Sequence, residues 1–369
     1  MIGTRVVVDA PTNGYVRLAE ELKQAVSAGR IPVGECLPPA KRLAAQYGVS
    51  SETARRAAKR LEREGWVVSL PRHGFRVLAR ANDPDRGLPI AFVVGGAEKP
   101  ELWSAFYRLL FAGLQKAAAD RGWSILAVGI GQRSGLAVMD QLRACRACGM
   151  VVDAEHSDLI DVALQTGMPV VMMDAWETSM RVDAVVQDSF QGALVATQYL
   201  IDRGHERIGW LGPISRSTQN QERFGGYCAA MAAAGLSLRP EYMRDTPWTE
   251  VDAAAYALLS GRDRPTAALG LWHDAAAALV RAARQLGLRP RDVEIVGWTP
   301  EEQHDGVYRT FFKGEASPAS MAWSIAELTR LTVAQLARRR ADPKAAPTFV
   351  KVPTRLIPAE TSQARRTRQ

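Results

Sequence analysis

The stretch DAVVQDSFQGALVATQYLIDRGHERIGWLGP, residues 183–213, holds the pattern that decides the fold of most of the chain. Two short apolar runs, 183–188 and 207–213, flank residues 189–204, whose apolar positions follow a helical pattern. A helix between two continuous apolar runs is typical of a parallel sheet, because such strands are buried on both faces. The stretch therefore predicts a strand–helix–strand unit of an α/β fold.

The same alternation of short apolar runs and helical patterns continues on both sides of this stretch. The runs are more numerous than the strands that one compact sheet usually holds, so we expect two sheets. A late strand is expected within PKAAPTFVKVPTRLIP, residues 343–358. Further buried strands are predicted at 90–96, 123–129, 149–154, 169–175, 266–272 and 293–298.

Composition sets the broad class of protein. The chain has 369 residues, of which 47% are hydrophobic and 23% are charged. These values are typical of a folded chain with two or three domains. No apolar run is long enough for a membrane helix, and the first residues lack the pattern of a secretory signal. We therefore expect a cytoplasmic protein without a membrane partner, whose four cysteines form no disulfide framework.

The positive charge is concentrated in the first part of the chain. Residues 1–80 hold 14 Lys and Arg against 7 Asp and Glu, a net charge of +7, whereas the remaining residues have a net charge of +1. A basic module attached to a nearly neutral body favours a polyanion as the partner of that module. The alternative is a basic face that contacts only solvent. Charge does not distinguish the two, so the choice depends on the pattern of residues in the module.

Three helices and a hairpin are predicted within this basic segment. Apolar residues recur at helical spacing in 15–26, and a second helix is expected to end at Gly48. Ser50 or Ser51 is expected to cap a third helix. The run WVVSLPRHGFRVLAR, residues 66–80, suggests two strands around a turn. These elements form a winged helix-turn-helix, whose third helix fits the major groove of DNA.

An ordered motif runs through this module, made of Ile31, Gly34, Leu37, Pro38, Leu43, Ala44, Tyr47, Gly48, Val49, Ser50, Thr53, Arg55, Leu61, Glu64, Gly65 and Gly74. The motif resembles the winged-helix domain of the gluconate-repressor (GntR) family. The resemblance implies that the module binds double-stranded operator DNA. A winged helix that binds protein is the alternative, which the basic third helix opposes.

The residues expected to contact DNA lie on the third helix and at the tip of the wing, and the resemblance adds Lys41 at the start of the second helix. Two of them depart from the family pattern, since Ser51 stands where many members have Arg and Glu52 where Thr is common. The loss of that Arg removes a guanine contact, whereas Glu52 is suited to accept a hydrogen bond from a cytosine amine. The full predicted set is Lys41, Ser51, Glu52, Thr53, Arg55, Arg56, Arg72, His73 and Gly74.

The rest of the chain carries a second set of motifs, namely PIAFVV, FYRLLFAGLQKAAADRGW, GMVVDA, GMPVVMMDA, the stretch quoted first, RFGGYCAAM, RPTAALGLWHDAAA and VEIVGW. In this order they resemble the effector domain of the lactose/galactose-repressor (LacI/GalR) family. The resemblance implies the periplasmic-binding-protein type I fold, with two lobes joined by three crossings. It also implies an arabinose-repressor-like chimera, in which a GntR-type module replaces the usual headpiece.

The residues expected to bind an effector combine charged groups with tryptophans at the ends of strands. Carboxylates accept hydrogen bonds from paired hydroxyls, Arg donates two parallel hydrogen bonds, and flat rings suit sugar faces or aromatic ligands. Trp272 also lies at such a strand end, and core packing is the alternative for each tryptophan. His273 replaces a common Asn, and Trp298 begins a segment that replaces a common aromatic–Asp pair. The predicted set, in which Ser104 and Phe106 are implied by the resemblance alone, is Trp103, Ser104, Phe106, Asp174, Trp176, Arg223, Trp248, His273, Asp274 and Trp298.

The domain boundaries follow from these patterns and from the polar, proline-containing segment ANDPDRGLP. The predicted parts are a winged helix at 1–80, a linker at 81–89, an effector-binding domain at 90–360, and a tail at 361–369. Within the effector-binding domain, the predicted N-lobe is 90–187 with 306–340, and the predicted C-lobe is 188–305 with 345–360.

We therefore expect a homodimeric, ligand-responsive transcription regulator, a repressor, that binds operator DNA and a sugar-like effector. The first alternative is a winged helix fused to a pyridoxal-phosphate enzyme, and the second is a solute-binding transport component. No catalytic motif is present, so we expect no enzymatic activity, no cofactor and no metal. Cys145 and Cys148 form a CxxC pair without further metal ligands. We interpret the two as buried structural thiols, and a redox pair is the alternative.

Overall fold

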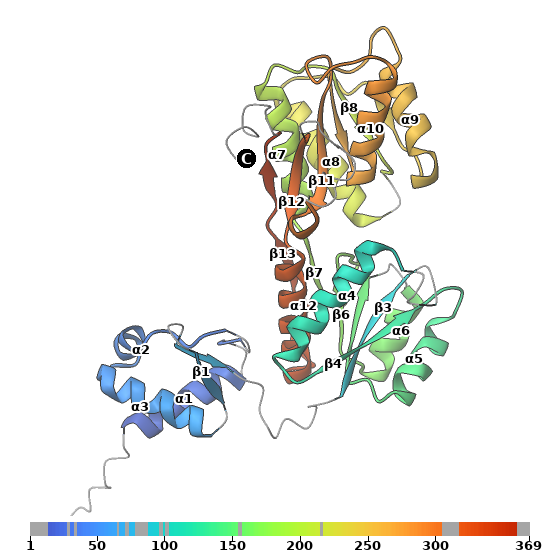
Figure 1. Cartoon of the computed structure of the whole chain (residues 1–369). Coiled ribbons are helices and arrows are strands. Elements are labelled where there is room, and N and C mark those ends of the chain that lie inside the picture. The colour runs from blue at the N-terminus through green and yellow to red at the C-terminus, as the bar shows by residue number, and fades with distance from the viewer. Residues whose placement is uncertain are drawn as a thin grey trace, which may run out of the picture. The chain divides into compact units, whose positions relative to one another are not determined.

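The computed structural model contains a small N-terminal helical module and two six-stranded sheets (Figure 1). Two compact units are defined by contacts: Met1–Val151 with Asp158–Val170 and Val333–Ala346, and Val152–Ser157 with Val171–Thr332 and Pro347–Gln369. The domain and lobe boundaries given above stay predictions. The structure describes residues 14–27, 30–32, 35–64, 66–70, 74–77, 88–95, 99, 103–153, 157–214, 217–304 and 317–359.

The N-terminal module is a helix-turn-helix followed by a hairpin, which confirms the predicted architecture. Ser50 caps the third helix, because its Oγ accepts a hydrogen bond from the Thr53 N–H at 3.0 Å. Gly48 ends the second helix in the left-handed conformation, with a φ of 65°. The apolar faces of the three helices and the hairpin form one core. The elements are α1 (Gly14–Ser27), α2 (Ala40–Tyr47), α3 (Ser51–Arg63), and the antiparallel strands β1 (Val67–Leu70) and β2 (Gly74–Val77).

The first sheet has the strand order β13-β7-β6-β5-β3-β4. Strand β3 pairs with β4, β6 with β7, and β7 with β13, each time in parallel, as the continuous apolar runs predict. Helices α4, α5 and α6 follow β3, β4 and β5 in the chain. The strands are β3 (Pro89–Val94), β4 (Ser124–Gly129), β5 (Met150–Asp153), β6 (Val170–Met173), β7 (Asp183–Gln187) and β13 (Phe349–Val352), and the helices are α4 (Ala105–Ala119), α5 (Gly135–Ala144) and α6 (Ser157–Thr166).

The second sheet has the strand order β14-β12-β11-β10-β8-β9, and only its edge strand β14 is found to pair in antiparallel fashion among the described residues. Its strands are β8 (Ile208–Leu211), β9 (Met243–Arg244), β10 (Ala267–Gly270), β11 (Glu294–Pro300), β12 (Ala319–Trp323) and β14 (Arg355–Ile357). The remaining helices are α7 (Ser189–Asp202), α8 (Thr218–Ala233), η2 (Pro240–Tyr242), η3 (Trp248–Glu250), α9 (Val251–Leu259), α10 (His273–Gln285) and α12 (Ile325–Ala341).

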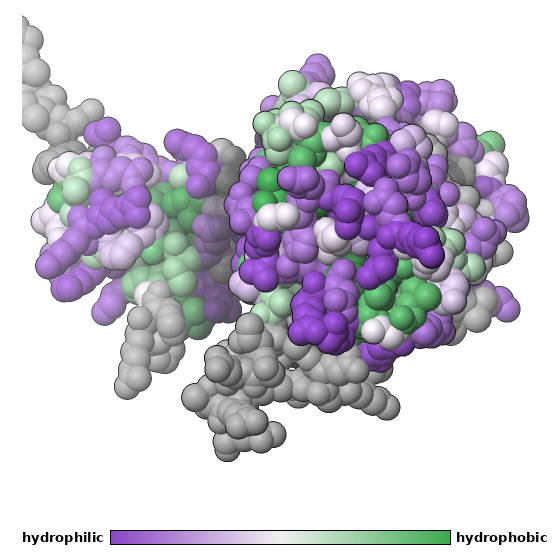
Figure 2. Space-filling view, turned by 90° about the horizontal axis from the view of Figure 1, so that it is seen from above, coloured by the Kyte–Doolittle hydropathy of each residue, from purple (hydrophilic) through white to green (hydrophobic). Residues whose placement is uncertain are grey.

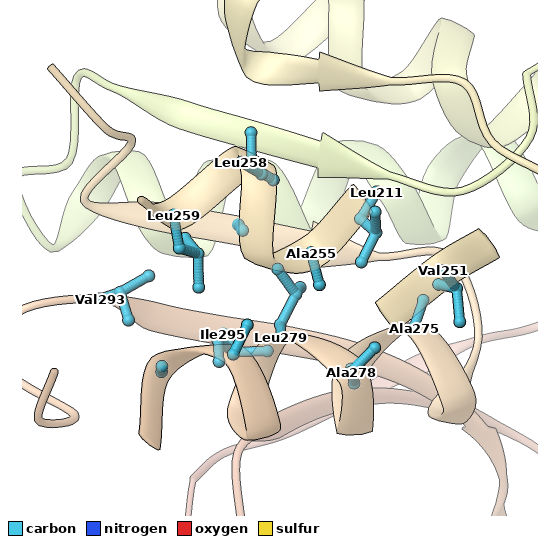
Figure 3. Packing of buried hydrophobic residues seen from close by; sticks show 14 of the residues in the cluster. Leu211, Val251, Ala255, Leu258, Leu259, Ala275, Ala278, Leu279, Val293 and Ile295 are labelled. Atoms are coloured by element: carbon cyan, nitrogen blue, oxygen red, sulfur yellow. The ribbon is translucent and has the colours of Figure 1, made fainter. Parts of the chain in front are cut away.

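The core of the second sheet is formed where α9 and α10 pack against its strands (Figure 3). Leucines of α9 meet a run of small residues on α10, in which Ala275, Ala276 and Ala278 are fully buried. Because alanine side chains are short, α10 approaches the strands closely. A Cβ on Gly270 of β10 would lie 2.5 Å from the backbone nitrogen of Ala276. This close packing fixes the position of the carboxyl end of β10, the strand that precedes α10 in the chain.

The chain passes between the two sheets three times within the described residues. It leaves the first sheet after β7, returns to it after β12, and leaves it again after β13 to form β14. The prediction of two parallel sheets in an α/β fold is thus confirmed. The single late strand expected within 343–358 is instead two strands, β13 and β14, one in each sheet.

The viewed face of the molecule is mostly hydrophilic, with smaller apolar areas between the polar side chains (Figure 2). Among the helices that the structure describes, none combines the length and the apolar character that a membrane crossing requires.

The interpretation of Cys145 and Cys148 as buried thiols is wrong. Cys145 is exposed and Cys148 is half-buried. Cys145 caps the C-terminus of α5, and the chain then turns through Arg146 with a φ of 54°. The pair therefore lies in a turn at the end of a helix, where side chains reach solvent, and outside the buried face of that helix.

We predict that Gly226→Ala lowers the melting temperature of the protein. A Cβ on Gly226 of α8 would overlap the carbonyl oxygen of Phe190 and lie 2.9 Å from the Leu194 nitrogen, both on α7. Overpacking of this kind costs roughly 1–3 kcal/mol of unfolding free energy. The matched control is Gly225→Ala, because a Cβ there would meet only the Phe190 ring, at 3.5 Å. Thermal unfolding of both variants checks this, and equal melting temperatures would contradict the close α7–α8 contact.

Candidate functional site

The third helix of the N-terminal module presents a basic face on the side opposite its buried one. Ala54, Ala57, Ala58 and Leu61 are buried, whereas Arg55, Lys59 and Arg63 are exposed and repeat every fourth residue. Residues four apart lie on one face of a helix, so these three cations form a stripe. The neighbouring Arg60 is engaged within the module, since its Nε lies 2.7 Å from Glu64 Oε1.

The predicted DNA-contacting residues differ in exposure. The side chains of Glu52 and Arg55 are 71% and 68% exposed, with 3.9 Å between Glu52 Oε2 and Arg55 Nη1. Arg56 is exposed and its guanidinium lies over the Tyr15 ring at 4.5 Å. Lys41 and Gly74 are exposed, Ser51 and Thr53 are half-buried, and Arg72 and His73 lie outside the described residues. The contacts of this whole set with DNA stay predictions.

A buried polar cluster in the second compact unit is organised by the side-chain amide of Gln187, at the end of β7. Its Nε2 donates to both carboxylate oxygens of Asp174, at 2.8 and 3.0 Å. Its Oε1 accepts from Arg223 Nη2 at 3.0 Å and from Trp298 Nε1 at 2.7 Å. An amide serves both sides, because its N–H groups donate to the carboxylate and its oxygen accepts from the other two groups. Gln187 thus joins three residues that the sequence predicts as effector-binding.

Arg223, on α8, is fully buried between two indole rings. Its guanidinium carbon lies 3.8 Å from the ring centroid of Trp272 and 4.0 Å from that of Trp298, which are cation–π distances. Its Nη1 donates to the Leu271 carbonyl at 2.8 Å, whereas its Nε has no hydrogen-bond partner among the described residues. Burial lowers the pKa of Arg223 to about 9, against the opposing charges of Asp174 and Glu222. The guanidinium therefore remains protonated at neutral pH.

Asp174 follows the last residue of β6 and has a left-handed backbone, with a φ of 57°. Strained backbone of this kind is often found at functional sites. Burial raises the pKa of Asp174 to about 6, although hydrogen bonds from Gln219 and Gln187 and the charge of Arg223 lower it. A second carboxyl group, that of Asp153 at the end of β5, is also buried, and burial together with the charge of Asp174 raises its pKa well above the usual value.

The other predicted effector residues of the second unit lie around this cluster or apart from it. Trp176 is half-buried and packs edge-on against Phe349, with ring centroids 5.4 Å apart. Trp248 is 43% exposed, and its ring lies 6.2 Å from that of Trp272. His273 and Asp274 begin α10 next to Trp272, with the Asp274 carboxylate exposed and 3.6 Å from His273 Nε2.

Three predicted effector residues, Trp103, Ser104 and Phe106, belong to the first compact unit. Trp103 is buried and makes edge contacts with Phe92, Tyr107 and Phe111. Ser104 is exposed and caps α4, and Phe106 is half-buried. The effector roles of all ten predicted residues stay predictions.

Sequence reasoning missed three members of the cluster: Asp153, Gln187 and Gln219. All three interact with Asp174, which the sequence did predict, but none of them belongs to a spacing pattern. The available signal was a polar side chain at the carboxyl end of a predicted strand, where open α/β sheets bind ligands. That signal applies to Asp153 and Gln187, which end β5 and β7.

Comparison with known proteins matches the two parts of the chain to two families. Residues 93–368 match the family described as periplasmic binding proteins and sugar binding domain of LacI family. Residues 14–77 match the family described as bacterial regulatory proteins, gntR family. These two matches do not favour the alternative of a winged helix fused to a pyridoxal-phosphate enzyme.

Similar curated proteins are transcriptional repressors. The chain is 29% identical over 202 residues to the HTH-type transcriptional repressor PurR of Photobacterium profundum, which covers 52% of this chain and 60% of that protein. It is 31% identical over 141 residues to the ribose operon repressor of Haemophilus influenzae, which covers 37% of this chain and 42% of that protein. The chain thus spans 60% or less of the length of these two relatives.

Solved structures show the same fold. A putative ribose operon repressor from Burkholderia thailandensis superposes with a TM-score of 0.61 and 24% identity, over 74% of this chain and 99% of that one. The transcriptional regulator CelR in complex with cellobiose superposes with a TM-score of 0.65 and 21% identity, over 88% of this chain and all of that one. Since the LacI-type match covers most of its length, the chain belongs to the family of periplasmic binding proteins and LacI-type sugar-binding domains.

Proposed function

We propose that the protein is a transcription regulator, acting as a repressor, that binds operator DNA through its winged helix and a small effector through its LacI-type domain. The proposal rests on the presence of two features in the same chain. These are the exposed basic face of α3 and the buried cluster of Asp174, Gln187 and Arg223. Such a regulator binds ligands and catalyses no reaction. It works in the cytoplasm, where its operator is.

The DNA-binding part of the proposal rests on α3. A helix of this width enters the major groove, where its first turn reaches base edges and the later cations meet phosphates. Glu52 and Arg55 lie in the first turns, whereas Lys59 and Arg63 lie further along. We therefore assign base contacts to the first pair and phosphate contacts to the second. A homodimer places two such helices on a two-fold operator.

The effector-binding part of the proposal rests on the cluster around Gln187. Asp174 offers an acceptor, Arg223 retains an unused N–H, and the indole rings of Trp272 and Trp298 lie next to them. A sugar or sugar derivative fits this chemistry, because its hydroxyls donate and accept hydrogen bonds while its faces pack on aromatic rings. The ligand alters DNA binding only to the extent that it binds two states of the protein with different affinity.

We predict that Lys59→Gln and Arg63→Gln each weaken DNA binding and reduce its salt dependence. Each lost phosphate contact lowers the slope of log K against log salt by about one unit. Fluorescence anisotropy with a labelled duplex at several salt concentrations measures this slope. The control is Arg17→Gln on α1, an equal charge change at a side chain that is 79% exposed and paired with Glu21. An equal effect of all three substitutions would show that net charge, and not α3, governs binding.

We predict that a thermal-shift screen of sugars, sugar acids, polyols and nucleobases finds a ligand that raises the melting temperature. A ligand at 100 times its Kd stabilises the folded state by about 2.7 kcal/mol. Arg223→Lys should abolish the shift, because a compact ammonium cannot occupy the planar space between two indoles and donate to both acceptors. The control is Arg281→Lys, since Arg281 forms a surface ion pair with Asp252. A ligand whose shift survives Arg223→Lys would place the effector site elsewhere.

A further inference from the structure

Asp153 and Asp174 form a buried pair of carboxyl groups at the carboxyl ends of the neighbouring strands β5 and β6. Their residues are 9% and 5% exposed, respectively. Asp174 is well satisfied, because Gln187 donates to both of its oxygens. Asp153 differs, since its Oδ2 is buried and has no hydrogen-bond partner among the described residues. A buried acceptor without a donor is costly, so this oxygen indicates a missing partner.

The charges of the cluster do not balance. Arg223 is the one cation that acts on Asp174 in the described part of the chain, and its two Nη groups donate to neutral oxygens, those of Gln187 and Leu271. Glu222, the neighbouring carboxylate on α8, also acts on Arg223 but is itself paired with Lys351. The charge that acts on Asp153 is that of Asp174, and Asp174 in turn has one guanidinium near it, which is hydrogen-bonded elsewhere. With both carboxyls ionised, the buried cluster has an excess negative charge.

A second unused group lies in the same cluster. The Nε of Arg223 is buried without a partner, although the residue is fully enclosed by protein. A buried N–H without a partner is costly, so an acceptor oxygen next to it would be stabilising. In the same way, a donor next to Asp153 Oδ2 would be stabilising. One ligand that carries a hydroxyl next to a positively charged nitrogen supplies both groups.

We propose that the Asp153–Asp174 pair binds a cationic nitrogen of the effector, so that the effector is an amine-bearing polyol such as an amino sugar. The inference rests on the proposed function, because it specifies the ligand of the same domain. The ammonium group donates to Asp153 Oδ2 and Asp174, and a neighbouring hydroxyl accepts from Arg223 Nε. Without the ligand, a proton on the pair takes the place of the ammonium charge.

The proton has a consequence for binding. Burial raises the pKa of Asp153 and of Asp174 above the ordinary value of 3.8, so the ligand-free pair takes up a proton as the pH falls toward about 6. A bound ammonium must displace that proton, so the affinity for an amine falls as the pH falls. A neutral sugar displaces no charge, and its affinity should change little over the same range.

The stability of the ligand-free protein tests the carboxyl pair by itself. Because both pKa values are raised on folding, the folded chain binds protons more tightly than the unfolded chain, and its stability decreases as the pH rises through them. Asp153→Asn removes one ionising group. The variant should therefore melt above the wild type at about pH 8, and the difference should shrink toward about pH 5.

The matched control for this experiment is Asp183→Asn. Asp183 is also buried, but its Oδ1 accepts hydrogen bonds from the Thr348 N–H at 2.8 Å and the Thr348 hydroxyl at 3.0 Å. Its substitution should lower the melting temperature at both pH values, because it disturbs a satisfied acceptor. If Asp153→Asn lowers the melting temperature to the same extent at both pH values, the pair does not hold the proposed excess charge.

The ligand itself is tested with matched pairs: glucosamine and glucose, galactosamine and galactose, mannosamine and mannose. We expect an amino sugar to raise the melting temperature of the full chain more than its neutral partner, more strongly at about pH 8 than at about pH 5. Asp153→Asn should remove this preference. If the neutral sugars stabilise as well as the amines, the amine proposal fails and the effector-binding function stands. If no amine stabilises the protein, the amine proposal fails, and the DNA-binding experiments judge the regulator separately.

Discussion

The effector-binding domain depends on the burial of one guanidinium group. Arg223 is fully enclosed, and removing a charge from water costs several kcal/mol unless other groups replace the water. Here the replacement comes from two indole faces and from two neutral oxygens, those of Gln187 and Leu271. These groups lie at or just beyond the ends of strands β7, β10 and β11. The position of Arg223 therefore depends on where β7, β10 and β11 end, because the groups that surround its guanidinium follow these strand ends.

The burial of Arg223 also explains why position 192 is a glycine and position 187 an amide. Gly192, on α7, leaves room for the Trp298 ring, since a Cβ there would lie 2.5 Å from its Cη2 atom. Gln187 orients the carboxylate and the cation without placing them in direct contact. A carboxylate at position 187 would repel Asp174, and a hydrocarbon side chain would leave the Trp298 N–H and the Asp174 oxygens without partners.

Periodicity predicted the fold well because it reflects burial. The apolar runs became the central strands, and Ser50 and Gly48 bound their helices as expected, because caps and turns depend on a few adjacent residues. Family resemblance pointed to Asp174 and Arg223. The position of Gln187 at a strand end was a usable signal, but its bridging role was not predictable, because that role comes from partners 13, 36 and 111 residues away. The burial of Cys145 was predicted wrongly because a helical pattern does not show at which residue the helix ends, and Cys145 lies at the C-terminal cap of α5.

Residues of the cluster are direct chain neighbours of residues that join the connections between the two sheets. Gln187 is followed by Asp188, at the first passage of the chain between the sheets, and Arg223 is preceded by Glu222. Lys351, on the strand before the last passage, has its Nζ 3.2 Å from Asp188 Oδ1 and 3.0 Å from Glu222 Oε1. A ligand changes an equilibrium only through contacts that differ between its states. Through Lys351, the chain neighbours of Gln187 and Arg223 are thus tied to the strand that precedes the last passage of the chain between the sheets.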